Sequence, residues 1–270
     1  MGRKDEIGVI QISSDVCAIQ SSGNSKRYKT LDLIRGITLI SMILYHMVWD
    51  LCNIFGVEIS WYGTQISFLW QQSICWTFIL LSGFCWSMGR KKLKRGLVVL
   101  AASLAVTAVT GIFVPEGFIL FGVLSLIGTG MLVMIPLDKF YRKIDPRAGL
   151  ILFFGLFIIT RFIASGSIGV GDWVLFTVPE ELYANLFTAY LGFPGDGFHS
   201  ADYFPLIPWL FLYHTGYFLY LIFEKYDFLE RMPEVSLKPV EWPGRHSLLI
   251  YLLHQPAVYG VLTAVFAFIK

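Results

Sequence analysis

The stretch LDLIRGITLISMILYHMVWD, residues 31–50, is an apolar run that also contains four ionisable side chains, Asp32, Arg35, His46 and Asp50. A helix rises about 1.5 Å per residue, so a run of this length can cross the ~30 Å hydrocarbon core of a bilayer. An arginine or aspartate in mid-membrane costs roughly 2.5–3.5 kcal/mol on insertion scales, so an evolved helix keeps one only where a partner or a task compensates it. The stretch therefore predicts a membrane-spanning helix with a functional polar face.

The composition of the whole chain is that of a membrane protein. Of its 270 residues, 56% are hydrophobic and only 15% are charged, and the mean hydropathy is +0.64. A soluble domain would carry about 25% charged residues. The apolar residues lie in long blocks, which predicts an all-α, polytopic bundle of about seven transmembrane helices. The blocks are residues 33–54, 66–88, 96–113, 118–137, 148–165, 204–223 and 247–269.

Lysine and arginine alternate between the connections that join these blocks. Basic residues lie in residues 3–29, 90–95, 139–147 and 225–245, whereas residues 55–65, 114–117 and 166–203 contain none. By the positive-inside rule, this pattern predicts a cytoplasmic N-terminus and an external C-terminus. Seven blocks fit the alternation, which supports their count.

Two parts of the chain outside the blocks have separate predictions. Residues 1–30 are polar and lack the apolar core of a signal peptide, so we expect a cytoplasmic tail followed by one transmembrane domain, residues 31–270. Residues 166–203 are rich in glycine and aspartate, and their apolar stretch is interrupted by Pro179. An external lid, or a re-entrant or interfacial helix, fits this segment better than a further span.

Several classes of protein are not supported by the sequence. The four cysteines, Cys17, Cys52, Cys75 and Cys85, form no C-x-x-C pair, so neither a metal site nor a disulfide framework is predicted. There is no GxxxxGK[ST] and no HExxH motif, which argues against nucleotide hydrolysis and metalloprotease chemistry. The blocks do not divide into two matching halves, which weakens a transporter interpretation.

The ionisable residues of the first block share one face of the predicted helix. Arg35 and His46 are eleven residues apart, so they differ by about 20° in azimuth and about 16 Å in height. Asp32 lies one turn from Arg35, and Asp50 one turn from His46. In the His46–Asp50 spacing the carboxylate can hold one ring nitrogen and leave the other as an acceptor, which a general base requires. Two structural alternatives stay open: an arginine that extends to the interface, and a purely structural His–Asp pair.

The last block begins with WPGRHSLLIYLLHQP, residues 242–256. Gly244 is predicted to break the chain and Ser247 to cap the final helix, with Arg245 and His246 at a cytoplasmic N-terminus that favours an anion such as phosphate. His254 lies two turns into the helix, where it either contacts substrate or is a hydrogen-bonded strut between helices.

The run GDGFHSADYFPLIPWL, residues 195–210, brings His199 and Asp202 to the outer end of the sixth block. The functional interpretation is a binding lip for a polar, sugar-like acceptor. The alternative is a solvated loop in which aspartates cap a helix that proline initiates.

Four of these strings resemble a known family. The first-helix stretch, FILLSGF (residues 78–84), DYFPLIPW (residues 202–209) and GRHSLLIYLLHQP (residues 244–256) are similar, in order, to the bacterial branch of the heparan-α-glucosaminide N-acetyltransferase catalytic-domain family, within the transmembrane acyltransferase superfamily. The resemblance covers residues 28–268. It implies transfer of an acyl group, acetyl by default, from cytoplasmic acyl-CoA to an acceptor beyond the membrane, commonly a glycan. It associates Arg35 with the CoA phosphates and His46 with acyl transfer.

The combined expectation is a membrane-bound, acyl-CoA-dependent acyltransferase in a bacterial cytoplasmic membrane. Its expected partners are the lipid bilayer, acyl-CoA and an extracytoplasmic glycan, with no metal and no nucleic acid, and a homo-oligomer is left open. The expected catalytic residues are His46 and Asp50; the CoA-binding residues are Arg35, Arg245, His246 and Ser247; the acceptor-binding residues are His199, Asp202 and His254. A proton-coupled transporter of a small polar solute is the alternative, because buried titratable groups also serve proton relays.

Overall fold

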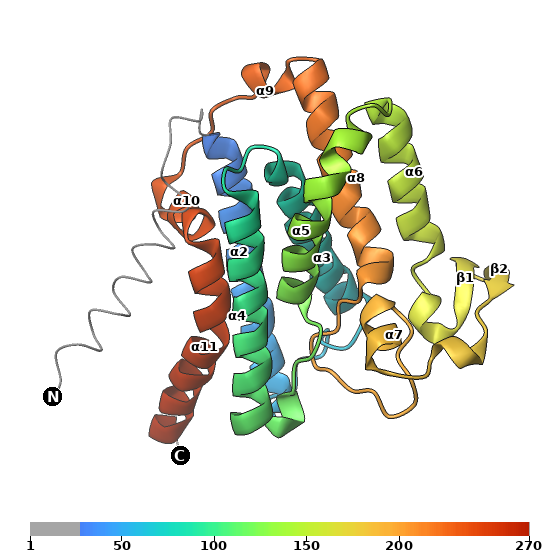
Figure 1. Cartoon of the computed structure of the whole chain (residues 1–270). Coiled ribbons are helices and arrows are strands. Elements are labelled where there is room, and N and C mark those ends of the chain that lie inside the picture. Colours follow the sequence, from blue (N-terminus) through green and yellow to red (C-terminus); the bar gives the residue numbers. More distant parts are fainter. Residues whose placement is uncertain (1–27, 270) are drawn as a thin grey trace, which may run out of the picture. The chain divides into compact units, whose positions relative to one another are not determined.

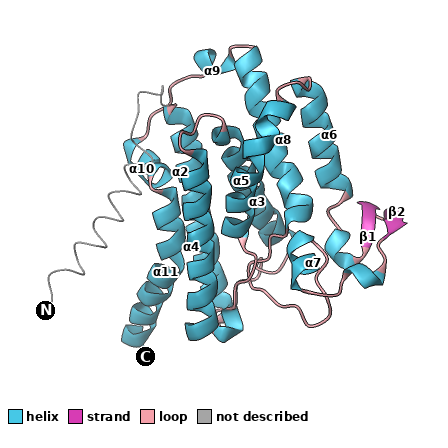
Figure 2. Ribbon diagram, in the orientation of Figure 1, coloured by secondary structure: helices cyan, strands magenta, loops and turns pink. Residues whose placement is uncertain are grey.

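The computed structural model describes residues 28–269, which are mostly helical (Figure 2). Among these described residues, seven helices are long and apolar enough to cross a membrane, which confirms the predicted all-α bundle and the number of spans. They are α2 (Lys29–Asn53), α3 (Gln65–Trp86), α4 (Lys92–Phe113), α5 (Val123–Tyr141), α6 (Pro146–Ile159), α8 (Leu206–Lys225) and α11 (Ser247–Ile269). Each overlaps one predicted block. The predicted tail, apart from its last three residues, and Cys17 lie outside the described residues.

The remaining elements are short. The helices are α7 (Leu186–Leu191), α9 (Phe228–Arg231) and α10 (Lys238–Arg245), the strands are β1 (Ser167–Val170) and β2 (Trp173–Thr177), and the 3₁₀ turns are Pro115–Gly117, Ile163–Ser165 and Glu180–Leu182. The chain divides into two compact units. Unit 1 contains residues 28–74 and 232–269, and unit 2 contains residues 75–231.

In unit 1, α10 and α11 both pack against α2 (Figure 1). Residues later in α2 contact residues later in the C-terminal segment. Three pairs mark this order: Asp32 with Arg245, His46 with His254, and Phe55 with Phe266. Helices α2 and α11 are therefore parallel, as the first and seventh spans of a seven-span chain must be. The Trp70 indole N–H donates to the Ser41 hydroxyl at 2.8 Å and joins the beginning of α3 to α2.

In unit 2, α8 packs closely against the second half of α3 because both helices carry a glycine at the crossing. A Cβ at Gly83 would lie 1.9 Å from the Tyr213 carbonyl oxygen, and one at Gly216 would lie 2.1 Å from that of Leu80. Larger side chains would force these helices apart. The FILLSGF string therefore has a structural reason for its glycine.

Aromatic side chains fill the centre of unit 2. Tyr217 and Phe218 of α8 are fully buried, and Phe218 stacks on Phe153 of α6 with ring centroids 5.4 Å apart. Trp86 of α3 is buried too, and its indole N–H donates to the Met131 carbonyl of α5 at 2.9 Å. Burial of such large rings supplies much of the packing energy that holds α3, α5, α6 and α8 together.

Residues 166–203 do not form one interfacial helix, so that part of the sequence prediction was wrong. The segment begins with the antiparallel hairpin of β1 and β2 and continues into the short helix α7 (Figure 1). Asn185 ends the extended part, because its side chain accepts hydrogen bonds from the N–H groups of Phe187 and Thr188 and caps α7. The lid interpretation stays a prediction.

Candidate active site

The ionisable stripe on α2 is present and only partly exposed. Asp32 and Asp50 are buried, and Asp50 is completely inaccessible, whereas Arg35 and His46 are half-buried. The Arg35 guanidinium lies 3.2 Å from the Asp32 carboxylate, the contact expected for residues one turn apart. Neither carboxylate is simply a solvated surface group, so each needs a partner inside the fold.

The start of α2 is covered by α10 at unusually short range. A Cβ at Gly36 would lie 1.8 Å from the Val240 carbonyl oxygen, and one at Gly244 would lie 2.0 Å from that of Asp32. The expectation that Gly244 breaks the chain was therefore wrong. Gly244 lies inside α10, and its lack of a side chain lets the two helix backbones touch.

This close approach brings two arginines and two carboxylates into one network. Arg245 donates a hydrogen bond to Glu241 at 2.8 Å, and its Nε lies 3.8 Å from Asp32 Oδ2. The other carboxylate oxygen of Asp32, Oδ1, contacts Arg35. The side chains of Asp32 and Glu241 are 8% and 2% exposed, against 24% for Arg35 and 40% for Arg245. Buried carboxylates thus orient guanidinium groups that stay accessible, and a planar guanidinium in a fixed orientation suits a phosphate.

Glu241 is a member of this network that sequence reasoning missed. Its spacing of four residues from Arg245 was an available signal, since such pairs meet on a helix face. The neighbouring Ser236 hydroxyl and the Arg245 guanidinium lower the pKa of Glu241 from its usual 4.5, although burial acts in the opposite direction. The carboxylate is therefore ionised at neutral pH and available to Arg245.

Farther along α2, His46 meets His254 of α11. The two imidazole rings lie at a steep angle with centroids 4.7 Å apart. The Nδ1 atom of His254 is 2.6 Å from the Tyr251 carbonyl oxygen one turn earlier on α11. The sequence separated these histidines into catalytic and acceptor-binding groups, and the structure brings them into one cluster.

Asp50 makes a different contact from the one expected. Within residues 28–269 no hydrogen bond joins it to His46; it accepts one from the side-chain N–H of Gln255 at 2.7 Å. The expectation that Asp50 orients His46 through a ring nitrogen is corrected by this geometry. The spacing on α2 allowed the His–Asp pair, but α11 supplies a closer donor.

The other residues predicted to bind CoA lie at the junction of α10 and α11. The His246 ring contacts that of Trp242 in a tilted arrangement, with centroids 4.8 Å apart, and its Nδ1 lies 3.0 Å from the Trp242 carbonyl oxygen. Ser247 is the first residue of α11 and is half-buried. A role for either residue in CoA binding stays a prediction.

The predicted acceptor-binding residues His199 and Asp202 lie in unit 2. His199 is exposed. Asp202 accepts a hydrogen bond from the Val123 N–H at 3.3 Å and so satisfies the start of α5. The cap considered from the sequence was one on the helix that follows the loop, α8, whereas this contact is with α5. Acceptor binding by these residues stays a prediction.

Unit 2 contains a buried histidine that the sequence reasoning did not select. His214 is 4% exposed and lies among Tyr141, Phe153 and Tyr213, with its Nδ1 3.4 Å from the Tyr141 hydroxyl. Its location within an apolar block of α8 gave no signal beyond its residue type. Because aromatic rings from three helices surround it, we interpret His214 as a packing residue.

A metal site was not expected from the sequence. Over the described part of the chain, no three His, Cys, Asp or Glu side chains are arranged to hold a metal ion.

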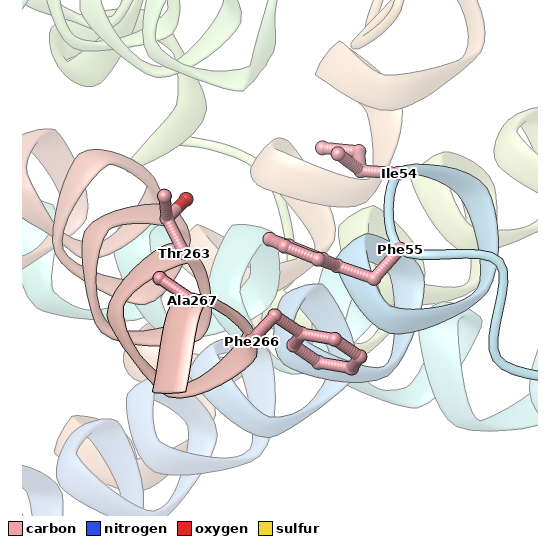
Figure 3. A pocket seen from close by; sticks show the side chains of 5 residues that line it. All are labelled: Ile54, Phe55, Thr263, Phe266 and Ala267. Carbon is pink, nitrogen blue, oxygen red and sulfur yellow. The ribbon is translucent and has the colours of Figure 1, made fainter. Parts of the chain in front are cut away.

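A half-open pocket of about 290 Å³ lies at the far ends of α2 and α11 (Figure 3). It is lined by Ile54, Phe55, Thr263, Phe266 and Ala267. The Thr263 hydroxyl already donates to the Tyr259 carbonyl, so the lining offers a surface for hydrocarbon and no titratable group.

Comparison with known proteins gave one family. The model of the family described as heparan-alpha-glucosaminide N-acetyltransferase, catalytic, matches residues 27–256, which is most of the chain. The match includes the stripe on α2, all of α10, and α11 as far as Pro256. Comparisons with curated proteins and with solved structures gave no match.

Proposed function

Because this multi-pass membrane protein belongs to the heparan-alpha-glucosaminide N-acetyltransferase catalytic family, we propose that it moves an acetyl group from cytoplasmic acetyl-CoA to a glycan beyond the membrane. The acceptor atom is a hydroxyl or an amine. The observation that carries the proposal is the His46–His254 cluster, which lies inside the matched region and inside a membrane-spanning pair of helices.

The donor end of the proposed site is the network around Arg35 and Arg245. The phosphates of CoA are strongly anionic, and two accessible guanidinium groups lie on the same face of unit 1. Asp32 and Glu241 neutralise the network as a whole, which limits its attraction for small anions. They also fix both cations in place, so less side-chain entropy is lost when a phosphate binds.

The reacting end is His46, about 16 Å farther along α2 at 1.5 Å per residue. The pantetheine arm of CoA is a flexible chain and would extend along the stripe from Arg35 to present its thioester to the imidazole. His46 then acts on the acyl group, either as the base that activates the acceptor or as the group that carries the acetyl between donor and acceptor.

The test is transfer of label from [¹⁴C]acetyl-CoA into the macromolecular fraction of inside-out membrane vesicles from cells that express the full chain. We expect incorporation with the wild type and a strong loss of incorporation with His46→Ala, because either role places this imidazole at the reacting acyl group. The amount of His46→Ala protein in the membrane fraction should equal that of the wild type, which shows that membrane insertion is unchanged.

A second preparation tests the competing class, a transporter of a small polar solute. Purified protein in liposomes that moves solute without transferring label would be a carrier and would refute the enzyme assignment. Full incorporation by His46→Ala would remove His46 from the mechanism and leave the rest of the proposal standing.

A further inference from the structure

The tautomer of His254 is determined by its surroundings. Its Nδ1 lies 2.6 Å from the Tyr251 carbonyl oxygen, and a carbonyl can only accept a hydrogen bond. The hydrogen of a neutral imidazole must therefore be on Nδ1, and Nε2 keeps its lone pair. This is the arrangement in which a backbone carbonyl prepares a histidine to accept a proton.

The lone pair of His254 is one of three buried acceptors on α2 and α11 that have no donor within residues 28–269. His254 Nε2, Asp50 Oδ2 and Gln255 Oε1 are inaccessible and have no hydrogen-bond partner among the described residues. Asp50 Oδ1 accepts from Gln255 Nε2, and this contact is what leaves Oε1 of the amide as the free atom. A buried acceptor without a donor is costly, so the free Nε2 of His254, whose ring contacts His46, indicates a position that receives a donor.

The two histidines differ in how they are prepared. His254 has its tautomer fixed by the backbone, while the carboxylate expected to orient His46 is bonded to Gln255 instead. The groups that face His254 are His46 from α2, with ring centroids 4.7 Å apart, and Tyr251 of its own helix. The imidazole that is ready to take a proton is thus the one on α11.

We propose that His254 is the catalytic base of the reaction and that His46 contacts the acyl group beside it. The inference rests on the acyl transfer proposed above. As the acceptor hydroxyl or amine attacks the thioester carbon, its proton passes to His254 Nε2. The new bond from oxygen or nitrogen to carbon replaces the carbon–sulfur bond. The proton on Nε2 then passes to the departing sulfur, which leaves as CoA thiol, and the histidine is neutral again.

The experiment compares His254→Gln with the wild type in the labelled vesicle assay, from pH 6 to pH 9. Glutamine can accept a hydrogen bond but cannot take a proton. We expect kcat to fall about 10²–10⁴-fold with a small change in KM for acetyl-CoA, because a base acts in the transition state. The rate that remains should rise with pH throughout, since hydroxide replaces the missing base.

A matched variant separates this role from packing. His214→Gln removes a buried histidine of unit 2 and should keep kcat within about threefold of the wild type. Thermal unfolding in detergent, with and without acetyl-CoA, checks that each variant folds and binds the donor. Two results would overturn the inference: near wild-type kcat and pH profile in His254→Gln, or a loss of rate that is accompanied by loss of the acetyl-CoA-induced stabilisation. Absence of transfer in the wild type would refute the acyltransferase proposal, and the inference with it.

Discussion

The guanidinium of Arg35 is held between two groups of different kinds. Asp32 lies 3.2 Å away on its own helix, and the Gly244 carbonyl accepts from it at 3.4 Å from α10. Both contacts are made by the same terminal nitrogen, Nη1. The proposed phosphate would approach the exposed part of the guanidinium without displacing either contact.

We therefore expect Arg35→Ala to raise the KM for acetyl-CoA about 10–100-fold, because a hydrogen bond between charged groups contributes roughly 1.5–3 kcal/mol. The effect on kcat should be smaller. Steady-state transfer at varied acetyl-CoA checks this, with Arg231→Ala, an exposed arginine of α9, as the control that should behave as the wild type. A change confined to the acceptor KM would contradict the phosphate role.

Two residues of the candidate site show which contacts could be predicted from the sequence. Asp32 and Arg35 were placed one turn apart on the same face from their spacing alone, because a helix has 3.6 residues per turn, and the structure joins them in an ion pair. Asp50 was assigned to His46 by the same rule, and the partner proved to be Gln255. Helical spacing shows which partners Asp50 can reach within α2. The packing of α11 on α2 decides which partner it binds.

At the scale of elements, apolar blocks of about twenty residues were sufficient to locate all seven spans. The helix α10 was missed, because its eight residues contain two prolines and are too polar to form a block. The hairpin of β1 and β2 was missed for a related reason, as its second strand is apolar and exposed throughout, which is also typical of an interfacial helix. Short elements carry too few residues for a periodic pattern to show.

The contact of α10 with α2 gives an element-scale prediction. Gly244→Ala would place a methyl group where the Asp32 carbonyl oxygen lies 2.0 Å away, so the helices must separate. We expect a loss of about 1–3 kcal/mol, the usual cost of overpacking, and a lower unfolding temperature in detergent.

Gly260→Ala is the matched control for this change. Gly260 is also a helical glycine of unit 1, and a Cβ there would have no atom within 4 Å. Alanine should raise helix stability slightly, by about 0.5–1 kcal/mol. Equal unfolding temperatures for Gly244→Ala and the wild type would show that α10 does not rest on α2 as described.

At the scale of the whole molecule, the direction of each span follows from the count. Seven spans place the two ends of the spanning region on opposite sides, and the parallel order of α2 and α11 agrees with this parity. By the positive-inside rule we expect the basic connections, residues 90–95 and 139–147, to face the cytoplasm, which is the side of the proposed acyl donor. The proposed chemistry needs this orientation, since a donor-binding network on the outer side would never meet CoA.

Cysteine labelling tests the orientation directly. In a variant whose four native cysteines are replaced, Glu116→Cys lies in the connection after α4 and Lys143→Cys in the connection after α5, and both native side chains are exposed. We expect a membrane-impermeant maleimide to label Glu116→Cys in intact cells and Lys143→Cys only after permeabilisation. The opposite pattern would place Arg35 and Arg245 at the external face. Transfer from a cytoplasmic donor through this network would then be excluded, whatever the outcome at His46 and His254.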